Sequence, residues 1–201
     1  LNLNLRCASQ VLYSLQAFKA IDAQAIYSEL VQMPWEEIIP DPGYFSVTSN
    51  VSNESINNSM FANLRVKDAI VDRLRDIRTE RPKTGAALTG TVIHLHWKDD
   101  FAEIFIDTTG DSIARHGYRK IPGLAPMLEG LAAATIYASK WDKKSPFINP
   151  MCGSGTLAIE AALMASNKVP GLFRSNYAFM HVLGYDAAVY DMERLNIEAQ
   201  I

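Results

Sequence analysis

The sequence predicts two domains of different class, an α+β domain followed by the N-terminal part of an α/β Rossmann-like domain. Two observations carry this prediction. From residue 7 to residue 107, apolar residues recur with the periods of two helices, a strand, a long helix and two further strands. From residue 147 to residue 165, a short apolar run, a glycine-rich turn and a helix-forming run follow one another, which is the order of a strand, a loop and a helix in α/β domains.

The first two elements are predicted to be helices. Asp22 is suited to cap the second helix, which runs to about Gln32 and ends before Pro34 and Trp35. The first helix is expected over Cys7–Lys19, because four apolar residues there have helical spacing. They are Val11, Leu12, Leu15 and Phe18.

A strand, a long helix and a hairpin complete the first domain. After a turn at residues 40–43, Tyr44–Val51 alternates between apolar and polar residues as a half-buried strand does. Gly90–Trp97 and Phe101–Asp107 alternate likewise and are joined by a short polar turn, which predicts a β-hairpin. Asn57 or Asn58 can cap the helix that lies between them in sequence. Its apolar stripe consists of Ala62, Val66, Ala69, Ile70, Leu74 and Ile77.

The second half begins with a polar connector, residues 108–125. Pro126 is expected to open a helix at its first position. The buried face of this helix is predicted to comprise Leu128, Leu131, Ala132 and Thr135. Phe147 and Ile148 are expected to end a strand, and Thr156 to begin the helix after the glycine-rich turn. Asp186–Ile201 is predicted to form a last helix.

Length and composition exclude several classes of protein. The chain has 201 residues, 48% of them hydrophobic and 20% charged, which is enough for a normal core. No apolar run approaches the roughly 18 to 20 residues that a membrane span requires, and the first residues do not form a signal peptide. Cys7 and Cys152 lie far apart in sequence, so a reducing, cytoplasmic setting is expected.

The glycine-rich turn, Asn149–Thr156, predicts a site for a nucleotide-like cofactor. Gly153 and Gly155 can adopt positive φ and let a ligand lie against the backbone. The following helix start offers free N–H groups to an electronegative ligand. Leu157 stands where a phosphate-binding loop needs lysine, so a polyphosphate is not expected. The alternative is a purely structural turn.

A resemblance narrows the choice of cofactor. Asn149–Thr156 with Ile159–Ala162 resembles the S-adenosylmethionine loop of RNA methyltransferases that carry a THUMP domain, where aspartate is usual in place of Asn149. The resemblance extends over nearly the whole chain and is to the bacterial 23S ribosomal RNA guanine-N2 methyltransferases. Further matching segments are Lys67–Asp72, Gly117–Arg119, Ala125–Pro126, Leu131–Ala134 and Pro170–Leu172 with Arg174.

The resemblance implies a domain organisation and a cofactor site. Residues 1–107 would be the THUMP RNA-binding domain, with 1–5 as the last strand of a preceding ferredoxin-like domain, residues 108–125 the connector and residues 126–201 the N-terminal part of the methyltransferase domain. S-adenosyl-L-methionine is the implied cofactor and no metal is implied. Its contacts would be Tyr118, Arg119, Ala125, Pro126, Asn149, Pro150, Met151, Cys152, Gly153, Ser154, Gly155 and Thr156.

The resemblance also implies that this chain lacks the catalytic residues. Family members grip the target amine with an Asn-Pro-Pro-Tyr or Asp-Pro-Pro-Tyr motif. Here Asp41-Pro42 and Asn149-Pro150 are the only Asx-Pro pairs, and neither precedes a second proline. The chain is therefore expected to be an inactive piece of a longer enzyme. Asn149 also removes a negative charge that would favour the cationic cofactor, which predicts weaker affinity than with aspartate.

Basic residues gather between Arg65 and Lys83, seven against four acidic ones, although the net charge of the chain is −3. The predicted RNA contacts are Arg6, Lys67, Arg73, Arg75 and Arg81. The alternative is a solvated helix face with ion pairs. THUMP-type recognition is expected to depend on RNA shape and ends.

Other sites and functions have less support in the sequence. His94 and His96 share one strand face, but no third metal ligand stands nearby in sequence. Cys152 has no Cys/His arrangement that would make it a nucleophile, so a loop residue in contact with the ligand is expected. The competing functions are a DNA adenine-N6 methyltransferase, a transfer RNA guanine-N2 methyltransferase and a non-catalytic RNA-binding module.

Overall fold

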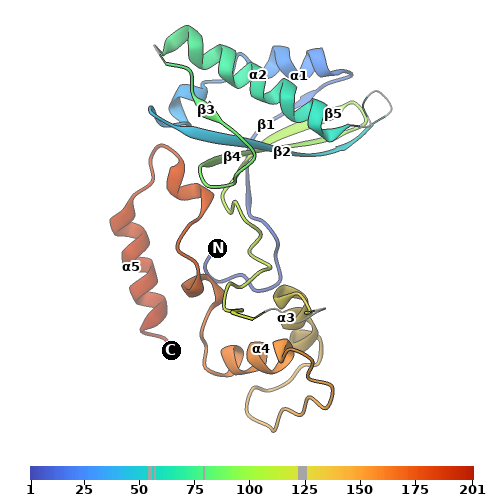
Figure 1. Cartoon of the computed structure of the whole chain (residues 1–201), viewed down its shortest axis with the longest axis vertical. Coiled ribbons are helices and arrows are strands. Elements are labelled where there is room, and N and C mark those ends of the chain that lie inside the picture. Colours follow the sequence, from blue (N-terminus) through green and yellow to red (C-terminus); the bar gives the residue numbers. More distant parts are fainter. Residues whose placement is uncertain (54–55, 57, 79, 122–125) are drawn as a thin grey trace. The chain divides into compact units, whose positions relative to one another are not determined.

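The computed structural model describes every residue except 54–55, 57, 79 and 122–125. The chain forms two compact units that alternate along the sequence (Figure 1). We name the first the sheet unit, residues Leu12–Asp111 with Asn176–Tyr185, and the second the glycine-loop unit, residues Leu1–Val11, Ser112–Ser175 and Asp186–Ile201.

The sheet unit is built on a five-stranded sheet in the order β1-β5-β4-β2-β3. Its strands are β1 (Leu12–Lys19), β2 (Tyr44–Ser52), β3 (Lys83–Thr84), β4 (Thr91–Lys98) and β5 (Phe101–Asp107). The pairs β1–β5 and β4–β5 are antiparallel, whereas β2 pairs in parallel with both β4 and β3. The strands predicted from Tyr44 and the hairpin of β4 and β5 are confirmed.

Two helices cover one face of this sheet (Figure 1). They are α1 (Ala23–Leu30) and α2 (Ser59–Ile77), and a short 3₁₀ helix, η1 (Trp35–Glu37), follows α1. Asp22 accepts a hydrogen bond from the Ala25 N–H and Asn58 accepts one from the Met60 N–H, so both predicted N-caps are confirmed. The α2 stripe is buried as predicted from Ala62 to Leu74, while Ile77 is exposed. No described helix is long and apolar enough to span a membrane.

The helix predicted over Cys7–Lys19 is wrong, because Leu12–Lys19 is the edge strand β1. Helical spacing of Leu12, Leu15 and Phe18 would place them on one face. In the strand Phe18 is buried, whereas Leu12 lies at the surface, and the pairing with β5 shifts register between Ser14 and Gln16. Pairing with a distant strand thus overrides the local pattern. The strand expected over residues 1–5 is also absent there, since these described residues form turns.

The glycine-loop unit contains α3 (Glu129–Ala138), α4 (Thr156–Ala165), η2 (Pro170–Phe173) and α5 (Ala187–Glu198). The predicted helices at Thr156 and after Asp186 are confirmed, and Asp186 caps α5. One buried apolar cluster of this unit comprises Ala133, Ile136, Ala161 and Met164, with Trp141, Phe147 and Leu157 packed against it. Leu3, Ile113, Ala114, Ala132 and Ile197 are buried in the same unit.

Two expectations for this unit are wrong. Pro126 does not open a helix, because α3 begins at Glu129 and residues 126–128 are irregular. Of the predicted buried face only Ala132 is buried, while Leu128, Leu131 and Thr135 are exposed; Glu129, Gly130, Ala133 and Ile136 take their place.

Phe147 and Ile148 do not form the predicted strand. A strand requires a neighbour with which to share ladder hydrogen bonds, and the described residues of this unit contain no strand. Phe147 instead packs on Trp141, and Ile148 is 83% exposed.

The bounds of the compact units differ from the predicted domain bounds. Residues 1–11 lie in the glycine-loop unit, although 1–107 was predicted as one domain. The segment Asn176–Tyr185, with the short helix η3 (Ala178–His181), lies in the sheet unit. Its Phe179 N–H donates to the Thr108 carbonyl, and the Thr91 hydroxyl donates to the His181 carbonyl.

Candidate functional site

The glycine-rich loop is open on the side a ligand would approach. Gly153 and Gly155 have φ of 53° and 78°, the left-handed region predicted for them. The Gly155 N–H donates to the Cys152 carbonyl at 2.8 Å, and α4 begins at the next residue. No described atom lies within 4 Å of a Cβ built on Gly153, and only the Ile159 Cδ1 approaches that of Gly155, at 3.9 Å. The protein's own described side chains therefore do not fill the bend.

Most side chains of the loop face solvent. Pro150, Met151, Cys152 and Ser154 are exposed, whereas Thr156 is buried. Cys152 is a free thiol. Asn149 is half-buried, and its Nδ2 is buried without a hydrogen-bond partner among the described residues. An unused amide donor thus lies at the start of the loop, at the position where the resembled family has aspartate.

Arg119 ties the loop to the segment before α3. Its Nε donates to the Glu129 carboxylate, its Nη1 to the Ser154 hydroxyl, and its Nη2 to the Met127 carbonyl and the Thr156 hydroxyl, all at 3.0 Å. Both partners of the Arg119–Glu129 ion pair are largely buried. Four hydrogen bonds from one planar guanidinium fix the two hydroxyl side chains of the loop relative to the start of α3.

A depression of about 490 Å³ lies beside this guanidinium. Arg119, Pro126, Met127 and Glu129 contribute to its walls. The Tyr118 ring instead packs edge-on against Phe173. Burial, together with the neighbouring Glu160 carboxylate, raises the pKa of the Tyr118 hydroxyl well above its ordinary value. The predicted cofactor contact Ala125 lies outside the described residues.

A buried polar cluster supports α4 from the inside. Glu160 and His116 are fully buried, and their Oε1 and Nδ1 atoms are 2.7 Å apart. The other ring nitrogen of His116 lies 2.9 Å from the Arg6 carbonyl oxygen, and the Arg6 Nη2 donates to the Lys168 carbonyl. The Arg6 Nη1 is 3.8 Å from the Glu160 Oε2. The cluster joins the N-terminal segment to the helix that carries the glycine loop.

This cluster changes the set of candidate RNA contacts. Arg6 is only 7% exposed and its guanidinium faces Glu160, so it is not offered to a phosphate. Arg73 donates two hydrogen bonds to the Glu36 carboxylate, which lower the pKa of Glu36. Arg75 is mostly exposed and lies 3.9 Å from Asp72.

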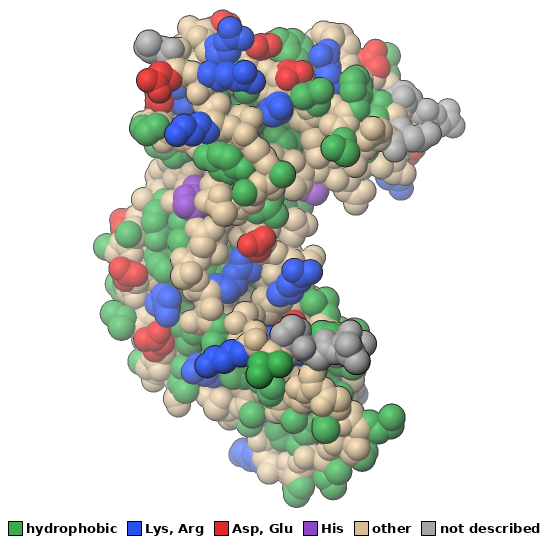
Figure 2. Space-filling model, viewed as in Figure 1, with side chains coloured by type: hydrophobic (Ala, Val, Ile, Leu, Met, Phe, Trp, Pro, Cys, Tyr) green, Lys and Arg blue, Asp and Glu red, His purple; other side chains and the backbone are tan. Residues whose placement is uncertain are grey.

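Two of the predicted RNA contacts are basic side chains without an ion-pair partner among the described residues. Lys67 and Arg81 form no ion pair with any residue that the structure describes. Figure 2 shows Lys and Arg side chains on the visible face of the sheet unit, interspersed with Asp and Glu. Part of the basic surplus is thus used in ion pairs, as the solvated-face alternative predicts, and part is free to meet a polyanion.

The two strand histidines have other partners. The His94 Nδ1 lies 2.8 Å from the Thr48 hydroxyl, and burial lowers the pKa of this imidazole. His96 is exposed. Among the residues that the structure describes, no three His, Cys, Asp or Glu side chains are grouped as a metal site requires.

Sequence reasoning missed Glu129, Glu160 and His116, which organise the loop and its helix. Glu160 could have been noticed, because it is the only charged residue of α4 and interrupts an apolar run. The pairing of Glu129 with Arg119, ten positions away, had no sequence signal.

Comparison with known families gives this arrangement a context. Residues 20–107 match the THUMP domain family, and residues 116–200 match the family described as RMKL-like, methyltransferase domain. The chain combines a THUMP domain with an RMKL-like methyltransferase domain. The predicted fold class is confirmed to the extent that a THUMP domain is followed by a methyltransferase domain. The family assignment depends on these matches and not on the strand that was wrongly predicted at Phe147.

One curated relative is the ribosomal RNA large subunit methyltransferase K/L of Syntrophotalea carbinolica. It is 40% identical over 190 residues, which are 92% of this chain and 27% of the relative. The chain thus spans about a quarter of the length of the curated relatives it matches.

Solved structures agree with the assignment. The candidate methyltransferase SMU.472, crystallised with SAH, superposes with a TM-score of 0.85 at 31% identity, covering 99% of this chain and 52% of the other. A predicted N6-adenine-specific DNA methylase from Listeria monocytogenes gives a TM-score of 0.86 at 29% identity, with the same coverage of both chains.

Proposed function

We propose that this chain supplies the RNA-binding domain and the methyl-donor loop of an S-adenosylmethionine-dependent enzyme that methylates guanine N2 in large-subunit ribosomal RNA. The observation that carries the proposal is the open bend at Gly153 and Gly155 before α4, in one chain with a THUMP domain. The likeness to the ribosomal RNA methyltransferase K/L supports the choice of substrate. A ribosomal RNA substrate also favours a cytoplasmic location.

The residues of the loop fit an adenosine-containing sulfonium cofactor. No side chain caps the start of α4, which leaves its first N–H groups to a ligand, and the positive φ of both glycines lets a ligand approach the backbone. Asn149, Pro150, Met151, Cys152, Ser154 and Thr156 would surround it, together with Tyr118, Arg119 and Pro126 on the connector side. When bound, the cofactor supplies an electrophilic methyl group.

Catalysis in this class is mainly alignment of the target amine with that methyl group. The chain has no Asn/Asp-Pro-Pro-Tyr motif to align the amine. We therefore expect this chain alone to bind cofactor and RNA but to transfer no methyl group. Turnover on ribosomal RNA by the isolated chain would contradict this part of the proposal.

Calorimetric titration with SAM and SAH tests the cofactor site. We expect saturable binding of one ligand per chain, and binding about tenfold or more weaker in Gly155→Val, because a β-branched residue is strained at φ of 78°. The matched control is Gly184→Val in the sheet unit, with φ of 89° and no described atom within 4 Å of its added Cβ. Equal losses in the two variants, or no binding by the unaltered chain, would remove the cofactor proposal.

A second candidate, DNA adenine-N6 methylation, is favoured by the likeness to the Listeria structure. The target is again an exocyclic amine, so the loop serves either chemistry. The THUMP match favours RNA. Binding of RNA and DNA oligonucleotides of equal sequence, measured over a range of salt concentrations, separates the two. Preference for DNA would replace the ribosomal RNA proposal.

A further inference from the structure

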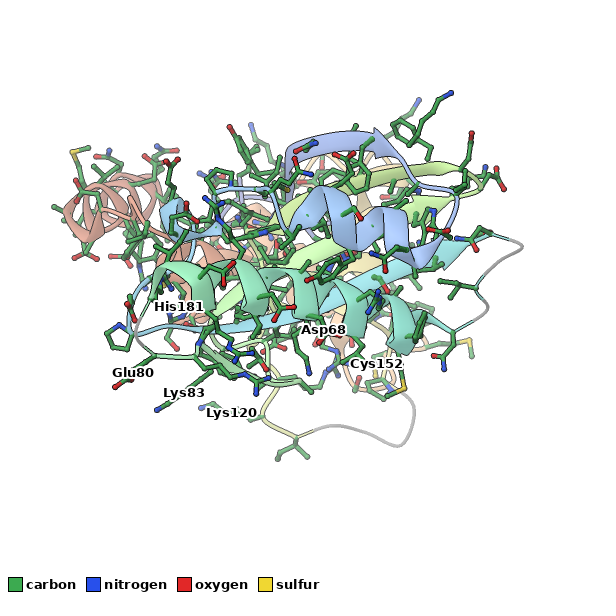
Figure 3. All side chains as sticks on the ribbon, turned by 90° about the horizontal axis from the view of Figure 1, so that it is seen from above. Asp68, Glu80, Lys83, Lys120, Cys152 and His181 are labelled. Carbon is green, nitrogen blue, oxygen red and sulfur yellow. The ribbon has the colours of Figure 1, made fainter. Side chains whose placement is uncertain are left out.

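A groove runs along the outer side of α2 in the sheet unit. Its helix wall carries three large apolar side chains, Met60, Phe61 and Leu64, which are 76%, 46% and 44% exposed. Thr84–Ala86, at and after β3, and Val47 of β2 line the opposite side. The volume is about 550 Å³. Figure 3 labels Asp68 on α2 and Lys83 on β3, which mark the two elements on either side.

These apolar residues are not part of the core. Ala62, Val66 and Ala69 face the sheet and are buried, so the first half of α2 has a second apolar stripe that faces outward. Contiguous exposed apolar surface in a folded domain marks a binding site. A groove with one aromatic ring on its wall suits a flat ligand, because such a ligand gains area against the ring face.

Two polar groups in the groove indicate what the flat ligand carries. Lys67 lines the groove and forms no ion pair with a described residue, and no Asp or Glu is among the groove's described lining residues. Asn63 lines the groove as well, and its Oδ1 is buried without a hydrogen-bond partner among the described residues. A guest that satisfies both groups has a negative group and a hydrogen-bonding edge beside its apolar face.

We propose that this groove binds one unpaired nucleotide of the RNA, with the base against Phe61 and the phosphate at Lys67. The Asn63 amide meets the polar edge of the base. The nucleotide is unpaired, because a base inside a duplex cannot present its face to Phe61. The proposal rests on the RNA-binding part of the proposed function and adds the recognised feature, a single-stranded or bulged position.

Fluorescence anisotropy with the full 201-residue chain tests the groove. The probes are a labelled single-stranded RNA and a blunt RNA duplex of the same sequence. Phe61→Ala is expected to weaken single-strand binding about tenfold or more, because base stacking on an aromatic ring is lost, and to leave duplex binding unchanged. The matched control is Phe101→Ala at the start of β5, since Phe101 is 48% exposed and lies outside the groove.

A second pair of variants tests the phosphate contact. Lys67→Ala should weaken single-strand binding and reduce the salt slope of log K by about 0.7. Lys98→Ala, at the exposed end of β4, should change neither quantity. In the unaltered chain, the methyl NMR signals of Met60 and Leu64 should shift when single-stranded RNA is added, which checks the site without any substitution.

The possible outcomes distinguish a failure of the groove proposal from a failure of the proposed RNA binding. If the chain binds RNA but Phe61→Ala and Phe101→Ala behave alike and the methyl signals stay in place, the groove proposal fails and RNA binding stands. If the chain binds no RNA, both fail. If Phe61→Ala instead changes the oligomeric state in light scattering without changing RNA affinity, the groove is a protein interface and the proposal is wrong.

Discussion

The interior of the sheet unit and the interior of the glycine-loop unit are stabilised by different interactions. In the sheet unit, Trp35, Phe45 and Trp97 are fully buried between two helices and a five-stranded sheet. In the described part of the glycine-loop unit no Phe, Tyr or Trp ring is fully buried, and the Arg119–Glu129 pair and the Glu160 cluster connect its segments. The difference teaches that the sheet unit has an aromatic core of its own, whereas the glycine-rich loop depends on polar contacts whose geometry is specific.

The glycine-loop unit also leaves large apolar side chains exposed. On α5 these are Val189, Met192 and Leu195, each more than half exposed and spaced three residues apart. Leu131 on α3 and Ile148 before the loop are exposed as well. Because the matched crystal structures are about twice as long as this chain, we propose that such faces pack against further parts of a methyltransferase domain.

The same substitution in both units is the strongest test of this comparison. Trp97→Ala removes a fully buried ring and the hydrogen bond from its Nε1 to the Ala20 carbonyl, so we expect a loss of about 4 kcal/mol in the free energy of unfolding. Trp141→Ala, at a half-buried ring, is expected to cost about 1 kcal/mol. Urea unfolding followed by circular dichroism measures both. Equal losses would contradict the contrast between the cores.

A polar substitution tests whether Glu160 is central to the glycine-loop unit. Glu160→Ala leaves the Arg6 guanidinium buried without its carboxylate, and we expect a loss of about 3 kcal/mol. Hydrogen exchange should show the loosening in α4 and residues 1–11. Glu198→Ala is the control, because its pair with Arg194 is exposed and should contribute less than about 0.5 kcal/mol. If the two variants are equally stable, the Glu160 cluster does not contribute to the stability of the unit.

Arg119→Lys tests the arginine fork itself. Lysine keeps the charge but cannot reach Glu129, Ser154 and Thr156 with one planar group, so we expect SAH binding about tenfold weaker, together with a lower unfolding midpoint. Arg115→Lys, at another wall of the same depression, should leave affinity unchanged. Unaltered SAH affinity in Arg119→Lys would show that the loop keeps its geometry without the fork.

The smallest expected effect is at Asn149. A carboxylate there would attract the sulfonium of SAM, so Asn149→Asp should bind SAM a few-fold more tightly. SAH lacks that charge, and its affinity should change less. Calorimetry with the two ligands gives the ratio of affinities. Equal SAM affinities in the two proteins would remove the charge argument, and equal gains for SAM and SAH would assign the effect to hydrogen bonding through the unused Nδ2 position.

Helix starts and the glycine turn were predictable, because residues close in sequence determine them. Asp22, Asn58 and Asp186 mark helix starts because their side chains accept backbone N–H groups within three residues. The positive φ of Gly153 and Gly155 follows from the same kind of short-range constraint. The sequence could therefore predict these helices and the open loop.

The predictions were wrong where the local structure depends on contacts with residues far away in sequence. Leu12, Leu15 and Phe18 fit a helix as well as a strand, and only pairing with β5 decides. Phe147 and Ile148 had no strand beside them among the described residues of their unit. Arg6 was predicted to contact RNA at the surface. Its burial against Glu160 could not be predicted locally, because the two residues lie more than 150 positions apart in sequence.

The alternation of the two units has a practical consequence. The backbone passes between them after residues 11, 111, 175 and 185, so neither can be excised or transplanted by a single crossover. A chimera that exchanged only residues 12–111 would leave behind the ten-residue strip whose carbonyl at His181 accepts from Thr91 and whose Leu183 N–H reaches Ile38. An exchange of either unit between proteins must therefore transfer several separate segments of the chain together.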